Sequence, residues 1–268
     1  MFIVKVPGIN SSDGKTVGCG RAGHAILNAL KDIHSNEQGK PIDVGLLDLE
    51  EIHLNNNDLK LTNKLIYENC LKIFGTKPKT IFLGGDHSIS YSISRAFLDI
   101  CRQSRKEPCL IIFDAYVDCR KSAEEFPTNK EWIRTLVGNG FPAENILIVG
   151  ARNIRKDELT FLKEHNIKVI NMNQILEDID ETCDIIMEFS DGKDLFVSID
   201  ISVVDPAFAP STAYAEPGGL TSRQFLYMIQ RINRVKNLKG VDLAEINEKK
   251  DSNLSTVRLG AKILAELI

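Results

Sequence analysis

The chain has 268 residues, of which 43% are hydrophobic and 26% are charged, and its formal net charge is −4. This composition is typical of a globular protein with a large core, and the acidic balance gives no support for a nucleic-acid or membrane partner. The six cysteines form no C-x-x-C pair, and the N-terminus lacks the features of a signal peptide, so we expect a reduced, cytoplasmic protein.

Short apolar runs alternate with helix-like segments along the whole chain. The runs predict strands at residues 2–6, 44–49, 80–83, 109–113, 146–149, 167–170, 195–199 and 241–243. Apolar residues at helical spacing predict helices at residues 23–33, 58–74, 89–101, 131–137, 157–165, 174–189, 222–232 and 255–268. This alternation predicts one α/β domain over residues 1–268, with a parallel sheet covered by helices on both faces.

Acidic and imidazole side chains follow three of the predicted strands. His87 follows one strand, Asp114 and Asp118 follow the next, and Asp200 follows a third. Because the carboxyl ends of parallel strands share one edge of the sheet, we expect these side chains to lie close together. Together they form a ligand set that suits a divalent ion such as Mn²⁺. The alternative is a structural histidine with carboxylates that only cap helices.

Four sequence blocks occur in a specific order: GGDHS at 84–88, DPAFAP at 205–210, PGGL at 217–220 and GVDLAEIN at 240–247. Together they resemble the ureohydrolase family of arginase, agmatinase and formimidoylglutamase, and the similarity covers nearly the whole chain. The resemblance implies a three-layer α/β/α sandwich with a mostly parallel eight-stranded sheet. It also implies hydrolysis of a C–N bond in a linear amidine or guanidine, a small cationic substrate, and a homo-oligomer that is a trimer or hexamer.

The resemblance further implies a site for two Mn²⁺ ions. One ion would be held by a histidine and three aspartates, all present here: His87, Asp114, Asp118 and Asp200. The second ion needs another histidine and another aspartate, and this chain has Tyr116 and Ser202 at those positions. We therefore expect at most about one Mn²⁺ per chain. The alternative is no ion, with a lysine or arginine in the cluster; without any cation, at least one carboxylate should take up a proton.

The resemblance also identifies candidate catalytic and substrate-binding residues. Glu245 matches the glutamate that receives the guanidinium group, although a carboxylate at a strand end can instead pair with a structural arginine. Asn129 falls near the position of a histidine found in relatives and is a second substrate-binding candidate. Asp118 and Glu245 are the catalytic candidates. We expect the Tyr116 ring to fill the second metal position, with its hydroxyl bonded to an aspartate.

Two functions remain after these observations. The first is a ureohydrolase-like hydrolase that works with one metal ion and has weak or altered activity. The second is an inactive pseudoenzyme with the same fold, which binds a cationic ligand or a partner subunit. The complete ligand set of one site favours the first, and the loss of both ligands specific to the second ion favours the alternative.

Overall fold

The computed structural model describes residues 1–11, 13–121 and 125–268. Its centre is an eight-stranded sheet with strand order β2-β1-β3-β8-β7-β4-β5-β6. The strands are β1 (Phe2–Val6), β2 (Asp48–Glu51), β3 (Thr80–Gly84), β4 (Pro108–Phe113), β5 (Ile146–Ala151), β6 (Lys168–Asn171), β7 (Asp194–Asp200) and β8 (Leu238–Ala244). Every neighbouring pair is parallel, so the sheet is more regular than the mostly parallel one that was expected.

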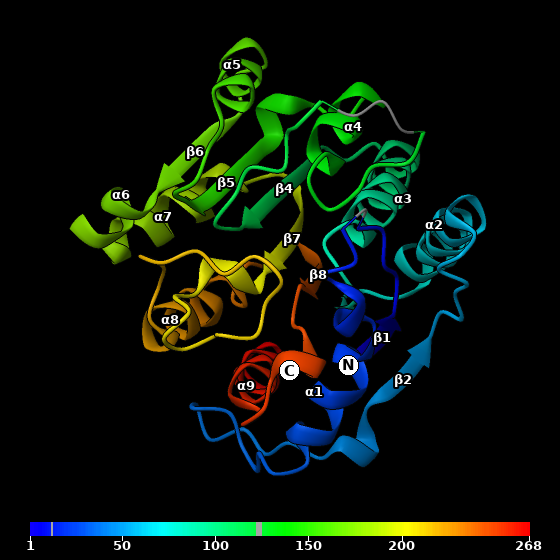
Figure 1. The fold of residues 1–268 in the computed structure, drawn as a ribbon, viewed down its shortest axis with the longest axis vertical. Helices are drawn as coiled ribbons and strands as arrows, with labels where there is room; N and C mark the ends of the chain where they lie inside the picture. Colours follow the sequence, from blue (N-terminus) through cyan, green and yellow to red (C-terminus); the bar gives the residue numbers. More distant parts are fainter. Residues whose placement is uncertain (12, 122–124) are drawn as a thin grey trace.

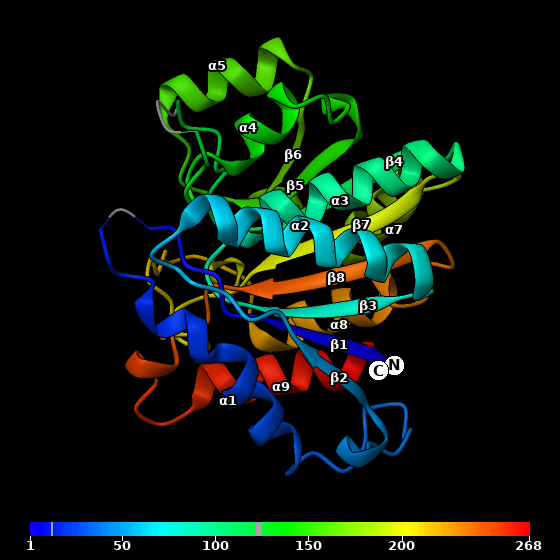
Figure 2. The same cartoon turned by 90° about the vertical axis from the view of Figure 1, so that its right-hand side faces the viewer.

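Helices cover both faces of the sheet and complete a three-layer sandwich (Figure 1, Figure 2). One layer contains α1 (Ala22–Leu30), α6 (Met172–Glu177), α7 (Ile179–Phe189), α8 (Ser222–Ile232) and α9 (Ser255–Leu267). The other contains α2 (Leu59–Thr76), α3 (Ile89–Ser104), α4 (Trp132–Gly138) and α5 (Lys156–Glu164). This arrangement confirms the predicted fold class.

Continuously apolar strands produce these two layers, because successive side chains of a strand point to opposite faces. In β4, Cys109 and Ile111 belong to the hydrophobic cluster on one face, whereas Leu110 and Ile112 belong to the cluster on the other. All six residues of β4 are buried. The sheet is therefore packed on both faces, and loops at the strand ends are left for function.

Two predicted elements are wrong in detail, and capping side chains explain both. The strand predicted at 44–49 begins late because Asp43 accepts a hydrogen bond from Gly45 N and starts a 3₁₀ turn, so β2 spans Asp48–Glu51. The single helix predicted at 174–189 is two helices, α6 and α7. Asp178 between them has an extended backbone and caps α7 by accepting from Glu181 N.

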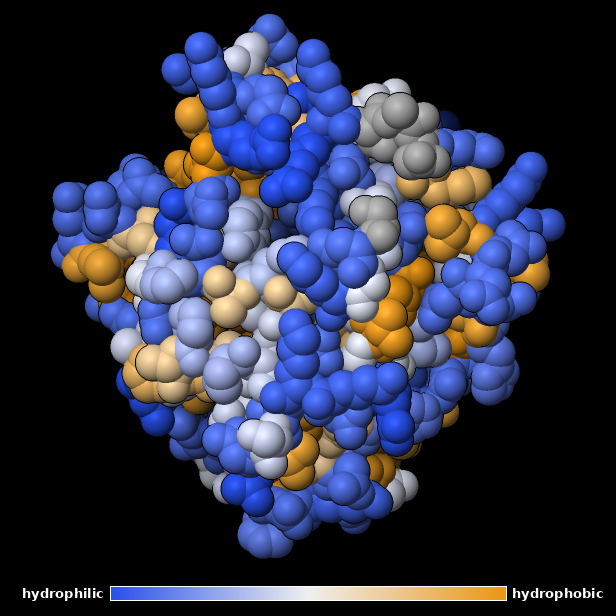
Figure 3. Space-filling view, viewed as in Figure 1, coloured by the Kyte–Doolittle hydropathy of each residue, from blue (hydrophilic) through white to orange (hydrophobic). Residues whose placement is uncertain are grey.

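The four central strands bring distant parts of the sequence to one edge. β3, β8, β7 and β4 are neighbours, and all four end at the same, carboxyl edge. That edge faces the viewer in Figure 3, where the surface is mostly hydrophilic with small, scattered hydrophobic patches. Among the described residues, no helix combines the length and hydropathy needed to cross a bilayer.

Candidate active site

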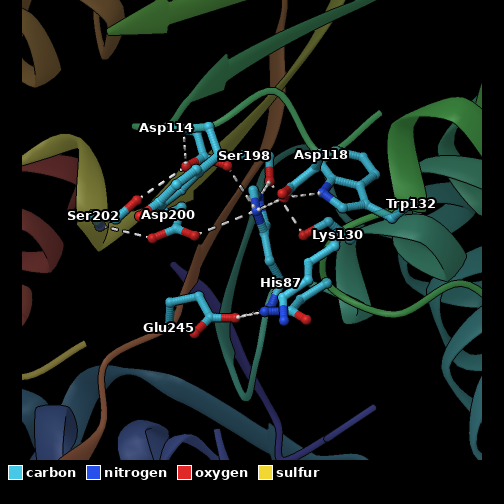
Figure 4. A network of polar contacts seen from close by, with 12 residues as sticks. His87, Asp114, Asp118, Lys130, Trp132, Ser198, Asp200, Ser202 and Glu245 are labelled. Atoms are coloured by element: carbon cyan, nitrogen blue, oxygen red, sulfur yellow. Dashed lines mark hydrogen bonds and ion pairs between the residues drawn. The ribbon is translucent and has the colours of Figure 1, made fainter. Parts of the chain in front are cut away.

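Three strand ends bring one imidazole nitrogen against three carboxylates (Figure 4). His87 follows β3, Asp114 follows β4 directly, and Asp200 is the last residue of β7. His87 Nδ1 lies 2.9 Å from Asp118 Oδ2, 3.2 Å from Asp114 Oδ2 and 3.6 Å from Asp200 Oδ2. The structure thus brings together all four residues that the sequence singled out.

The geometry of this cluster fits a single divalent ion. His87, Asp114 and Asp200 each offer a ligand atom within 4.8 Å of the others. Asp114 Oδ2 is buried without a hydrogen-bond partner among the described residues, as expected for an oxygen that needs a cation. Carboxylate oxygens with one imidazole nitrogen suit hard or borderline ions. Their roles as metal ligands stay predictions.

A buried hydrogen-bond chain sets the orientation of His87. Ser198 Oγ donates to Asp242 Oδ1 at 2.8 Å, and His87 Nε2 lies 3.0 Å from the same hydroxyl. The hydroxyl has one proton, so when it donates to Asp242 it accepts from the protonated Nε2 of His87. Nδ1 is then the ring nitrogen that a neutral imidazole leaves free for a metal ion. Without an ion, Nδ1 carries a proton and donates to Asp118 Oδ2 at 2.9 Å.

Sequence reasoning missed three supporting residues. Ser198 and Asp242 are adjacent in the pairing of β7 and β8, and each is a polar position inside a buried strand. That interruption was the available signal, because a polar side chain in a buried strand needs a partner. Trp132, the sole tryptophan, donates from Nε1 to Asp118 Oδ2 at 3.0 Å. No sequence pattern marked that contact.

Two carboxylates of the cluster, those of Asp118 and Asp200, hold protons more strongly than exposed carboxylates do. Burial and the negative charge of Asp114 raise the pKa of Asp118 to about 7 and raise the pKa of Asp200 well above its usual value. Burial lowers the pKa of His87, but the close carboxylates of Asp114, 3.2 Å away, and Asp118, which is hydrogen-bonded to Nδ1, outweigh this and raise the pKa well above normal. These directions agree with the expectation that the cluster takes up a proton when no cation is present.

Hydrogen bonds occupy the oxygens that a second ion would need. Asp114 Oδ1 accepts from Ser202 Oγ at 3.0 Å and from Tyr116 N at 2.9 Å. Asp200 Oδ1 accepts from Ser202 N at 2.7 Å. Ser202 therefore places a neutral donor against these aspartates, at the position where the resemblance implies a carboxylate for the second ion.

The expected contact of Tyr116 with an aspartate is wrong. Its hydroxyl donates to Glu216 Oε2 at 3.1 Å, and Asn153 Nδ2 donates to the same oxygen at 2.8 Å. The side chain lines the cavity described below, and its hydroxyl contacts the loop before α8. Burial and the charge of Glu216 raise the pKa of the Tyr116 hydroxyl, so it remains a donor.

Glu245 and Asn129 form a second polar group beside the cluster. Glu245 Oε1 accepts from Asn129 Nδ2 at 3.0 Å and from the backbone nitrogen of His87 at 3.1 Å. Glu245 Oε2 and Asn129 Oδ1 are buried and have no hydrogen-bond partner among the described residues. Burial and the nearby charges of Asp200 and Asp86 raise the pKa of Glu245 well above its usual value. Among residues 1–11, 13–121 and 125–268, no arginine pairs with Glu245, so the alternative of a structural ion pair finds no support there.

Backbone geometry is strained at two of these residues. Asp118 (φ 40°) and Glu245 (φ 65°) adopt the left-handed region, which is unfavourable for residues with a side chain. Gly85, whose carbonyl accepts from Glu245 N at 3.0 Å, allows the loop after β3 to pass Gly8, since a Cβ atom would lie 1.8 Å from Gly8 O. Such strain is typical of residues that are held in position for function.

A cavity of about 250 Å³ opens onto the cluster. Its lining consists of Asp13, Lys15, Tyr116, Asp118, Arg120, Asn129, Lys130, Asn153, Glu158, Asp200 and Tyr214. Across residues 1–11, 13–121 and 125–268, no lysine or arginine nitrogen lies within 4 Å of the clustered aspartates, so a basic side chain does not replace the ion there. The cavity can admit a small ligand to both Asp118 and Asn129.

The Arginase family model matches residues 2–268. The chain belongs to the arginase family. This membership confirms the resemblance inferred from the four sequence blocks and supports the general hydrolase class.

Relatives of this arginase-family chain include enzymes with different substrates. It is 27% identical over 275 residues to formimidoylglutamase of Bacillus subtilis, which covers 98% of this chain and 84% of that protein. It is 30% identical over 229 residues to agmatinase of Bacillus anthracis, which covers 84% and 75% respectively. The crystal structure of Bacillus subtilis formimidoylglutamase superposes with a TM-score of 0.88 at 26% identity, over 99% of this chain and 84% of that one. An arginase structure from Bacillus subtilis is 20% identical and has a TM-score of 0.82, over 100% of this chain and 97% of that one, which shows the shared fold.

Proposed function

We propose that this chain hydrolyses a C–N bond in a linear amidine or guanidine of the agmatine, arginine or formimidoylglutamate class. It works with one Mn²⁺ per chain, held by His87, Asp114, Asp118 and Asp200, and its activity is weak or altered. Family membership supports the hydrolase class. The complete ligand set at one site, beside hydrogen-bonded oxygens at the other, supports a single ion.

One observation carries the proposal: two buried acceptors beside the metal cluster have no partner among the described residues. They are Glu245 Oε2 and Asn129 Oδ1. Leaving a buried acceptor without a donor costs about 1–3 kcal/mol, so such groups normally meet a ligand or water. An amidinium or guanidinium group carries several N–H donors and a positive charge that complements Glu245. This head group is therefore the ligand that the site recognises.

Each residue has a defined part in the proposed reaction. A bound divalent ion would supply Lewis-acid activation of water. Glu245 and Asn129 hold the amidinium so that its carbon faces the cluster. Asp118 Oδ2, kept in place by Trp132 Nε1, accepts the proton that hydrolysis releases and returns it to the departing nitrogen. Ser198 keeps His87 in the tautomer that the cluster requires.

The experiment measures metal content and turnover on the same purified protein. We expect elemental analysis after Mn²⁺ loading to give no more than about one ion per chain, and we expect slow hydrolysis of at least one of agmatine, arginine and formimidoylglutamate. Asp200→Asn should abolish both Mn²⁺ binding and hydrolysis. Asp184→Asn, at an exposed site on α7, should change neither the metal content nor the turnover. Two tightly held ions per chain would disprove the single-ion proposal.

A double variant tests why activity should be weak. Tyr116→His with Ser202→Asp restores both ligands of the second ion, and we expect a second Mn²⁺ and faster hydrolysis, by up to on the order of a thousandfold. If the variant binds two ions but stays inert towards all three substrates, the site has diverged beyond its metals.

The pseudoenzyme remains the second candidate, because Ser202 and Tyr116 N occupy Asp114 Oδ1 and so close the second metal position. Binding of Mn²⁺ and of an amidine without any turnover would favour it. We further propose a cytoplasmic location and a homo-oligomer, which the family resemblance implies is a trimer or hexamer. A single domain over residues 1–268 stays a prediction.

A further inference from the structure

The solvent side of the cavity carries positive charge, in contrast to its acidic inner end. Lys15 and Lys130 line the same cavity as Asp118 and Asp200. The lysine side chains are 56% and 22% exposed, whereas those of the two aspartates are each 9% exposed, so the lysines lie nearer to solvent. A ligand that reaches the metal cluster must therefore extend from a basic outer end to an acidic inner end.

The outer end already holds a carboxylate, which belongs to Asp13. Tyr214 Oη donates to Asp13 at 2.8 Å and 2.7 Å, one distance to each oxygen, and Lys130 Nζ lies 3.2 Å from Oδ2. Lys15 Nζ is 3.7 Å from the same oxygen. Burial raises the pKa of Asp13, but hydrogen bonds from Ser11 and Tyr214 outweigh it and hold the pKa well below its usual value. These groups are thus arranged to bind an ionised carboxylate.

Asp13 balances only part of the positive charge of Lys15 and Lys130. Two ammonium groups share one carboxylate, which leaves a net positive charge. Both ammonium groups also lie over the ring of Tyr214, Lys130 at 4.4 Å and Lys15 at 5.4 Å from its centroid, which fixes their positions. Arg120 and Glu158 also line the cavity, and their opposite charges offset each other. A second carboxylate would therefore be attracted to this end, and an amine would be repelled from the lysines.

We propose that Lys130, Lys15 and Tyr214 form a subsite for a substrate carboxylate, which Asp13 occupies in the ligand-free protein. The substrate is then an amidine or guanidine with a carboxylate at its opposite end, rather than one with an amine tail. This inference rests on the proposed function, since it assumes that Glu245 and Asn129 hold the cationic head. Asp13 competes with the substrate tail, because both bind the same donors.

Two ligands of similar length separate the alternatives. Agmatine ends in an amine and 4-guanidinobutyrate ends in a carboxylate, and both carry the same guanidinium head. We expect calorimetric titration of the Mn²⁺-loaded full chain to show 4-guanidinobutyrate binding at least about tenfold more tightly than agmatine. Lys130→Met and Tyr214→Phe should each weaken the binding of 4-guanidinobutyrate several-fold and leave the binding of agmatine unchanged or tighter.

Asp13→Asn should instead tighten the binding of 4-guanidinobutyrate. Lys163→Met on α5 is the matched control.

Some outcomes overturn the subsite. The first is that the unaltered chain binds agmatine as tightly as 4-guanidinobutyrate, or more tightly. The second is that correctly folded Lys130→Met and Tyr214→Phe proteins lose binding of both ligands together. The third is that 4-guanidinobutyrate does not bind at millimolar concentration. Turnover is scored separately by urea or ammonia release. Hydrolysis without a preference for the carboxylate rejects the subsite alone, whereas a preference without hydrolysis of any amidine rejects the proposed function and retains the subsite.

Discussion

A single hydroxyl in place of a carboxylate changes the chemistry of the whole cluster. Ser202 Oγ donates to Asp114 Oδ1, where an aspartate would have repelled that oxygen unless a cation lay between them. The serine therefore satisfies Asp114 on one side only, while Asp114 Oδ2 keeps facing His87. At the residue scale, the ligand set expected for one ion is present, and hydrogen bonds occupy the oxygens expected to hold the other.

The pKa values of the cluster predict that Mn²⁺ stabilises the protein more at higher pH. The pKa of Asp118 rises from 3.8 to about 7 on folding, so the metal-free folded state binds more protons than the unfolded state between these values. The contribution of Asp118 to the stability of the folded protein is fully present below about pH 4 and is lost as the pH rises through about 7. An ion relieves this loss because it replaces the proton.

We expect the rise in melting temperature on Mn²⁺ addition to be clearly larger at pH 8 than at pH 5, measured by calorimetry. Asp118→Asn, which cannot ionise, serves as the comparison and should reduce the pH dependence. An equal rise at both pH values in the unaltered chain would contradict the proposed exchange of proton for ion.

At the scale of elements, side chains at helix starts decide where the loops around the site begin. Helix α8 follows the loop that contains Glu216 and the PGGL block. Thr221 Oγ1 accepts from Gln224 N at 3.2 Å, and Gln224 Oε1 accepts from Thr221 N at 2.9 Å. This reciprocal pair satisfies two backbone donors and fixes the point at which the loop becomes helix.

Thr221→Ala should lower the free energy of unfolding by about 1 kcal/mol, because the N-cap acceptor is lost. Urea denaturation measures the change, and Thr221→Ser, which keeps the hydroxyl, should be close to the unaltered protein. Thr221 is not part of the cavity lining, so Mn²⁺ content should stay the same. A change in metal content with unchanged stability would argue against a purely local capping role.

For the whole molecule, an aromatic cluster joins the sheet to one helical layer. Phe82 of β3 and Phe196 of β7 pack against Phe74 of α2 and Phe97 of α3, with ring centroids 5.5–6.3 Å apart. β3 and β7 also carry the residues that precede or form the metal cluster. The same packing that stabilises the core therefore fixes the separation of His87 and Asp200.

Phe196→Ala should destabilise the protein by about 3–5 kcal/mol, since it removes a fully buried ring and leaves a cavity. Phe196→Leu should cost less, because it retains most of the apolar volume. Urea denaturation of the two variants gives the comparison. If Phe196→Ala lowers stability by less than about 1 kcal/mol, the cluster does not couple the layers as described.

Prediction from sequence succeeded where the determinants are local. Apolar runs located most strands within a few residues, and β7 ends at Asp200, the candidate ligand expected at that strand end. It failed at Asp43 and Asp178, where a capping side chain overrode the apolar pattern. Ser198 and Asp242 were also missed, because their roles depend on the pairing of β7 with β8.

The sequence by itself determined the fold class, the family and the four residues that cluster at one edge of the sheet, because strand periodicity and the motifs themselves are patterns within short segments. Only the tertiary structure decided what fills the remaining positions. Tyr116 contacts Glu216 across 100 residues of sequence, Ser202 contacts Asp114 across 88, and Tyr214 contacts Asp13 across 201. These contacts form where strand-end loops converge on one edge of the sheet, and no local pattern records which loop will face which.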